Sequence, residues 1–222
     1  EGFAAAFAEA DAADPNAAYW FARGRAKLSA YLRAPSWTLR RIDGGDSSDA
    51  ALVARAVAHS QNADGARARA AAEALVAKRP EDAYAHELLG WVLFEARAWD
   101  AAARAYEAAA ALAPSEPLIA AGHGRALLAR GDEARALEVL EAARARDPFN
   151  PGLLRDLAQA QARMGDEGAA SLSTAERYAL AGRLQEAAIH AKRASGLLPR
   201  GSTRWRRAQD IVNAAETQDR RN

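Results

Sequence analysis

Small and large apolar residues recur along the middle of the chain with a period of 34 residues, which prolines at Pro80, Pro114 and Pro148 mark. In the segment beginning at Ala83, the large, small, small, aromatic, small and proline positions are Leu89, Gly90, Ala102, Tyr106, Ala109 and Pro114. The segment beginning at Pro117 gives Gly124, Leu127, Ala136, Leu140, Ala143 and Pro148. A weaker match near Asp49 gives Leu52, Ala56, Ala68, Ala72 and Pro80.

This pattern predicts pairs of antiparallel helices. Small residues are required where two helices cross closely, and the aromatic residue or leucine fills the space against the next pair. The proline ends the second helix because it has no backbone N–H to donate. A 34-residue period of this kind is typical of the tetratricopeptide repeat (TPR). We therefore expect an all-α fold, a TPR-type α-solenoid of antiparallel helix hairpins with atypical capping helices.

Turn and cap signals agree with these hairpins. Glycine-centred breaks occur at residues 130–132 and 164–166. Ser115 and Asn150 are the expected N-caps of two helices, and Pro151 occupies the favoured first helical position.

The regular frame fails after Pro151. The first helix of that repeat fits, but Thr174 and Arg177 fall where a large apolar and a small residue are needed. A frame shifted by half a repeat fits better, with Ala175, Tyr178, Gly182, Ala187, Ala194 and Pro199. We expect the helix over residues 167–181 to close one hairpin and open the next.

Three parts are predicted. Residues 1–48 form two helices, 1–13 and 16–32, followed by an irregular loop from Ala34 to Asp49. Residues 49–199 form the repeats, divided into 49–82, 83–116, 117–150 and 151–199, the last with the half-repeat shift. Residues 200–222 form a capping helix from near Ser202 and a polar tail. The chain begins Glu1-Gly2 without methionine, and we expect it to be a fragment of a longer protein.

Composition excludes several classes of function. The 30 basic and 29 acidic residues give a net charge of +1, which does not favour general attraction to nucleic acid. There is no cysteine, so disulfides, thiolate metal sites and cysteine nucleophiles are excluded. No apolar run is long enough to span a membrane.

No catalytic set is expected in this chain. A zinc peptidase needs two histidines four residues apart on one helix, and no pair among the 4 histidines has that spacing. The nearest approach is at His86, where Gly90 stands in place of the second histidine. We interpret His86 and His123 as structural residues packed between helices, and we expect no metal or cofactor here.

The first helix of each hairpin lines the concave face of a TPR stack, which makes its polar residues candidates for a peptide groove. These candidates are Gln61, Tyr84, Glu87, Trp91, Arg125, Arg155, Gln159 and Arg163. Trp91 would anchor a peptide and the arginines would bind carboxylates. Alternatively, these are ordinary solvated residues and Trp91 belongs to the core. A grip on a C-terminal carboxylate is disfavoured because the asparagines that it needs are absent.

A basic patch lies near the C-terminus, where only one acidic residue, Glu186, interrupts the basic ones. Its members are Arg177, Arg183, Lys192, Arg193, Arg200, Arg204, Arg206 and Arg207. The patch is suited to anionic lipid head groups, an acidic protein or nucleic acid, or it is a solvated helix face. Nucleic acid is disfavoured by the balanced total charge and the absence of a binding motif.

The final segment, with Leu198-Pro199-Arg200-Gly201-Ser202 and then residues 207–211 (RAQDI), resembles the C-terminal TPR tail of bacterial, BepA-like zinc metallopeptidases of alphaproteobacteria. The likeness extends over roughly residues 25–211. The resemblance implies a periplasmic protein whose separate catalytic domain, with an HExxH motif, holds the zinc. It also implies a tail that recruits substrates or partners, such as outer-membrane assembly machinery, for protein quality control. The alternatives are a stand-alone TPR scaffold or assembly chaperone, and a tail that folds over its own protease domain to regulate it.

Overall fold

The computed structural model describes residues 17–219, and in this part of the chain helices joined by loops are present without strands. The predicted helix over residues 1–13 lies outside the described residues. The all-α prediction is confirmed. The described chain divides into two compact units, one up to Ala105 and one from Tyr106, and the division falls within a helix.

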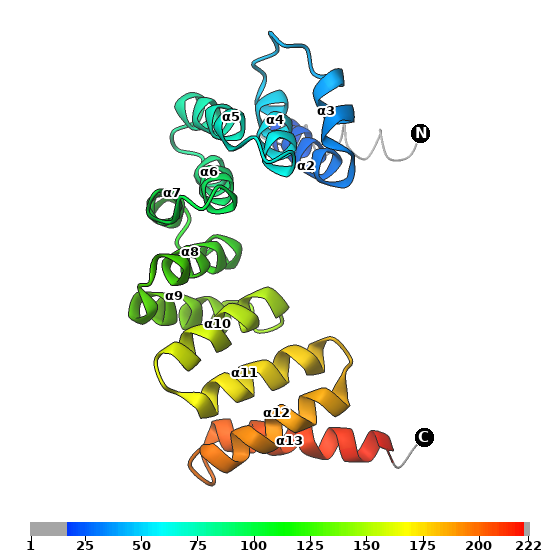
Figure 1. Cartoon of the computed structure of the whole chain (residues 1–222), viewed down its shortest axis with the longest axis vertical. Helices are drawn as coiled ribbons and strands as arrows, with labels where there is room; N and C mark the ends of the chain where they lie inside the picture. The colour runs from blue at the N-terminus through cyan, green and yellow to red at the C-terminus, as the bar shows by residue number, and fades with distance from the viewer. Residues whose placement is uncertain (1–16, 220–222) are drawn as a thin grey trace. The chain divides into compact units, whose positions relative to one another are not determined.

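The first unit contains α2 (Ala17–Leu32), α3 (Pro35–Arg41), α4 (Asp49–Gln61), α5 (Gly65–Lys78), α6 (Ala83–Glu95) and the start of α7 (Trp99–Leu112). α4 packs against α5 and α5 against α6, while α2 and α3 lie against α4 (Figure 1). Their shared core includes Val53, Val57, Leu75 and Leu88, all fully buried. Burial of each such aliphatic side chain contributes roughly 1.5–3 kcal/mol to the free energy of unfolding.

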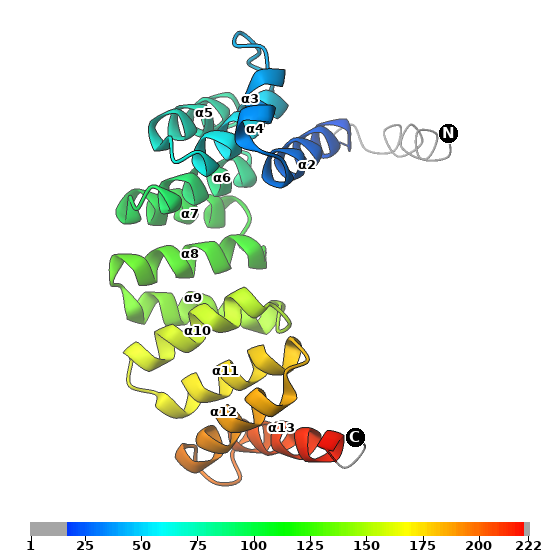
Figure 2. The same cartoon turned by 45° about the vertical axis from the view of Figure 1, so that its right-hand side comes forward.

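The second unit contains the rest of α7 and α8 (Pro117–Arg130), α9 (Glu133–Arg146), α10 (Pro151–Arg163), α11 (Glu167–Leu180), α12 (Leu184–Leu197) and α13 (Thr203–Asp219). Each helix from α8 onward packs against the next, so the chain runs back and forth through this unit (Figure 2). α8 also contacts α10, and α11 also contacts α13. A small core at the end of the unit includes Leu172, Leu198 and Val212.

The small residues lie where the pattern requires them. A Cβ atom on Gly124 would be 2.4 Å from the Leu140 Cγ atom, and one on Gly122 would be 2.3 Å from the Tyr106 ring. Ala102, Ala136 and Ala143 are fully buried. The crossings therefore leave no room for larger side chains.

Most predicted turns and caps are confirmed. Gly131 and Gly165 have φ angles of 88° and 82°, the left-handed region that glycine adopts without strain. The Asn150 side chain accepts a hydrogen bond from the backbone N–H of Leu153 at 3.0 Å, as an N-cap does. The prediction for Ser115 is wrong, because the cap of α8 is Glu116, the residue directly before Pro117.

The expectation of an irregular chain from Ala34 to Asp49 is wrong over α3. Pro35 occupies the first turn of this short helix, where its fixed φ angle favours helix formation. The Trp37 ring lies between the guanidinium groups of Arg33 and Arg41, at 4.1 and 4.7 Å. These local contacts, with the buried Thr38, hold a helix that no repeat pattern indicates.

Within residues 17–219, no helix is long and apolar enough to cross a membrane.

Candidate functional site

Two arginines and one buried carboxylate form a cluster between α8 and α10. The Arg125 Nε atom lies 2.7 Å from Asp156 Oδ2, and the Arg155 Nε atom lies 2.8 Å from Asp156 Oδ1. Asp156 is only 2% exposed. Because two guanidinium groups share one carboxylate, the cluster carries one positive charge in excess. The buried carboxylate also fixes the direction of both arginines.

This cluster is open to solvent. The side chains of Arg125 and Arg155 are 37% and 55% exposed, although the carboxylate between them is not. Gly152 lies beside Arg125, since a Cβ atom there would be 3.7 Å from the Arg125 Nη2 atom. Its missing side chain leaves space above the guanidinium group. Gln159 is exposed one helical turn after Arg155, on the same side of α10. We call this cluster, together with Gly152, Gln159 and Leu118, the α8–α10 face. Leu118 lies seven positions before Arg125.

Arg163 also lies at this helix pair but is engaged elsewhere. Its Nη1 atom donates to the Leu128 carbonyl oxygen at 2.9 Å and forms an ion pair with Glu133 at 3.3 Å. It therefore secures α10 against α8 and the start of α9.

In the first unit, α2 covers the groove positions predicted on α4 and α6. Glu87 is buried, and its Oε2 atom lies 2.9 Å from the Lys27 Nζ atom of α2. The Gln61 side chain donates to the Tyr31 carbonyl oxygen at 3.0 Å. Trp91 packs against the hydrophobic core of this unit and is only partly exposed, which matches the core alternative given above. These residues hold a helix of the same chain in place.

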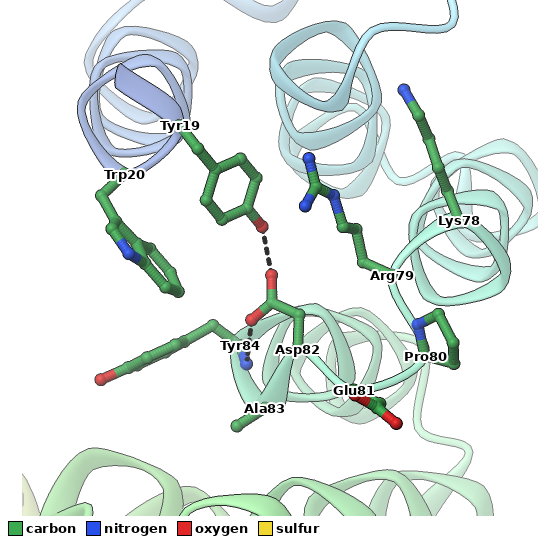
Figure 3. Close-up of a pocket in the computed structure, with 9 residues that line it drawn as sticks. All are labelled: Tyr19, Trp20, Lys78, Arg79, Pro80, Glu81, Asp82, Ala83 and Tyr84. Atoms are coloured by element: carbon green, nitrogen blue, oxygen red, sulfur yellow. Dashed lines mark hydrogen bonds between the residues drawn. The ribbon is translucent and has the colours of Figure 1, made fainter. Parts of the chain in front are cut away.

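A pocket of about 550 Å³ opens between α2 and the loop from α5 to α6 (Figure 3). The Tyr19 hydroxyl donates to Asp82, which also caps α6 by accepting from the Tyr84 N–H at 2.9 Å. Burial and the bond to Asp82 raise the pKa of Tyr19 to about 12, so this hydroxyl keeps its proton. Trp20 and Tyr84 meet edge-on at one side of the pocket, with centroids 5.6 Å apart.

The cations of this pocket have partners. Lys78 and Arg79, which line it, pair with Asp49 at 2.7 and 2.9 Å, and the buried Arg23 next to the pocket pairs with Asp82 at 3.3 Å. The pocket therefore has no excess positive charge comparable to that of the α8–α10 face.

Half of the residues of the predicted basic patch pair with carboxylates. Three of these four arginines have partners that precede position 177 in the sequence. Arg193 pairs with Glu167 at 2.8 Å, and Arg207 approaches Glu176 at 3.6 Å. Arg204 pairs with both Asp166 and Glu141. Arg183 pairs with Glu186, and Arg177 lies over the Tyr178 ring. Lys192, Arg200 and Arg206 form no ion pair within the described part of the chain. The role of the patch in binding stays a prediction.

The two histidines interpreted as structural differ in their surroundings. His123 is buried in α8, and burial lowers its pKa. His86 is only partly buried and bonds through its Nε2 atom to the Pro80 carbonyl oxygen at 2.8 Å. Its packing between helices stays a prediction. No cluster of three potential metal ligands occurs within residues 17–219.

A family model of the tetratricopeptide repeat matches residues 42–117 and 122–170, more than half of the chain. The chain belongs to the TPR family. The matched residues include most of α4 to α10, and Arg125, Arg155, Asp156 and Gln159 of the α8–α10 face lie among them. No curated protein matches the TPR chain.

Solved TPR structures share its fold. The structure "MamA MSR-1 C2" has a TM-score of 0.58 at 18% identity, covering 73% of this chain and 93% of that one. "MamA RS-1 ArsTM double mutant" has a TM-score of 0.59 at 20% identity, with 75% and 95% covered. YrrB, described as "a TPR protein with an unusual peptide-binding site", has a TM-score of 0.57 at 17% identity, with 85% and 98% covered.

Proposed function

We propose that this TPR chain binds an extended, acidic segment of another protein across the α8–α10 face. The observation that carries the proposal is the convergence of Arg125 and Arg155 on the buried Asp156. A ligand carboxylate would meet guanidinium groups that are already oriented, so little side-chain entropy is lost on binding.

The rest of the face suits a peptide main chain. Gln159 offers an amide that both donates and accepts, and Gly152 allows close approach of a backbone. Leu118 is an exposed apolar side chain on the same side of α8 as Arg125, and it provides contact area for an apolar residue of the ligand. The peptide-binding neighbour YrrB supports this class of function at the level of the fold.

The test is selection of random peptides on the whole chain, followed by affinity measurement on synthetic versions of the selected sequences. We expect the selected peptides to be rich in Asp and Glu. The Arg155→Glu substitution should weaken their binding by at least about tenfold, because the new carboxylate repels the acidic peptide. The matched control is Arg69→Glu on the surface of α5, where Arg69 pairs with its helix neighbour Glu73. Equal weakening by both variants, or none by Arg155→Glu, would refute this site.

A finer proposal rests on the sequence resemblance alone: the module recruits substrates or partners for a zinc metallopeptidase in the periplasm. The alternative, a stand-alone TPR scaffold, agrees with the nearly complete coverage of MamA and YrrB by this chain. Sequencing the natural gene upstream of Glu1 distinguishes them. A secretion signal and an HExxH helix support the protease tail, whereas an unrelated domain or a start codon at this point supports the scaffold.

A further inference from the structure

The outward side of α2 carries a stripe of large apolar side chains. Trp20, Phe21, Leu28, Tyr31 and Leu32 are between 43% and 73% exposed. At 3.6 residues per turn, all five fall within about 120° of arc around the helix axis. We call these five residues the α2 stripe. Contiguous exposed apolar surface of this kind marks an interaction site more often than a free surface.

Apart from Trp20, whose ring meets Tyr84 of α6, the stripe is not the side by which α2 packs onto its own unit. That side carries Ala30, which is fully buried, and Ala26, which packs against the same core. Arg23 and Lys27 reinforce it through their ion pairs with Asp82, the N-cap of α6, and with Glu87 of α6. Because α2 is already held on one side, the opposite stripe is presented on a fixed helix.

A comparison with α13 shows how the stripe differs from the outer side of the last described helix. The last helices of a solenoid need a polar outer surface to remain soluble. In α13, no described large hydrophobic side chain is exposed, and Trp205 and Ile211 turn toward the small core there. The α2 stripe is apolar where α13 is polar, and it is therefore suited to receive another helix.

The charge of α2 indicates what that layer is. Residues 17–33 contain Arg23, Arg25, Lys27 and Arg33 and no acidic residue. The acids that pair with Arg23 and Lys27 lie at the N-cap of α6 and within α6, whereas Arg25 lies beside the stripe over the Phe21 ring. Arg25 forms no ion pair with the described residues. A second copy of α2 would bring like charges together, which is unfavourable.

We propose that the α2 stripe docks an acidic amphipathic helix of a partner protein. Its apolar side chains would cover the stripe, and its flanking carboxylates would lie against Arg25. This surface and its helical ligand are separate from the extended peptide proposed for the α8–α10 face.

The probe for this proposal is a synthetic helical peptide of about 18 residues made of Ala, Leu and Glu, with leucines three and four apart on one side. Its affinity for the whole chain is measured by fluorescence anisotropy. We expect Leu28→Ser combined with Leu32→Ser to weaken binding at least about tenfold, since both leucines leave the contact. Ile189→Ser on α12 is the matched control, because Ile189 is similarly exposed. A peptide with lysine in place of glutamate should not bind.

Further variants separate this proposal from the others. Arg25→Glu should lower the affinity of the chain for the probe and reduce the salt dependence of that affinity. Arg155→Glu should leave the affinity unchanged. Failure of the probe to bind, or equal affinity for the leucine variant, would overturn the proposal. It would also be overturned if the probe bound only to a double variant that carries both Phe3→Ser and Phe7→Ser. In that case residues 1–16, which are themselves acidic, already cover the stripe. Self-association that is abolished by the leucine variant would equally overturn it in favour of a second copy.

Discussion

At the residue scale, the second unit is most tightly constrained at two glycines of α8. Gly122 and Gly124 have no Cβ atom where Tyr106 and Leu140 approach from the helices on either side. Both partner side chains are buried and have little freedom to move aside. The lack of a side chain at each glycine is therefore what allows these helices to approach.

Gly122→Ala and Gly124→Ala are each expected to lower the free energy of unfolding by about 1–3 kcal/mol, the usual cost of overpacking. Urea denaturation at constant temperature measures the change. The control is Gly196→Ala in α12, where nothing lies within 4 Å of the new Cβ atom. There the loss of backbone entropy in the unfolded chain should stabilise the protein by about 0.5–1 kcal/mol. If all three variants behaved alike, the close helix crossings would not determine stability.

At the element scale, caps decide where the helices begin. Asn150 accepts from the N–H of Leu153, whereas Ser115 is exposed and one residue removed from the cap of α8. Asn150→Ala should therefore cost about 1 kcal/mol of unfolding free energy. Ser115→Ala should stay within about 0.5 kcal/mol of the wild type. Thermal and urea unfolding of the two variants provide the comparison, and equal losses would contradict the assignment of the caps.

The same elements show how far the sequence predicts the fold. Repeating small residues and prolines identify the hairpins because each repeat solves the same packing problem with the same residue sizes. The short helix α3 lies outside the repeats and has no counterpart in them. Its contacts, Trp37 between two arginines and the buried Thr38, depend on its local environment and have no periodic signal.

The candidate sites were predictable only in part. Arg125 and Arg155 follow from the repeat frame, but the burial of Asp156 between them requires the packing of α8 on α10. The ion pair between Lys27 and Glu87 joins residues 60 positions apart, one of them in the non-repeating region. Counting charges over residues 177–207 likewise misses Glu167, which precedes that window and pairs with Arg193. Long-range pairing of this kind is not encoded in local composition.

At the scale of the whole molecule, each unit has a hydrophobic core of its own. Val53 and Leu88 belong to the core of α4 to α6, and Leu172 and Val212 to that of α11 to α13. In repeat proteins, each element is stabilised mainly by its nearest neighbours along the stack. Local opening therefore follows local packing, and the free energy of opening differs between elements.

Val53→Ala tests this locality. The substitution removes two methyl groups from a fully buried position and should cost about 2 kcal/mol, including the cavity that remains. In hydrogen exchange followed by mass spectrometry, we expect amides of α4, α5 and α6 to exchange faster. Amides of α11 to α13 should keep the wild-type rate, because their core shares no residue with the altered one. An equal acceleration in all helices would mean that the chain unfolds as one cooperative body. A ligand on the α8–α10 face would then stabilise α2 as strongly as α10.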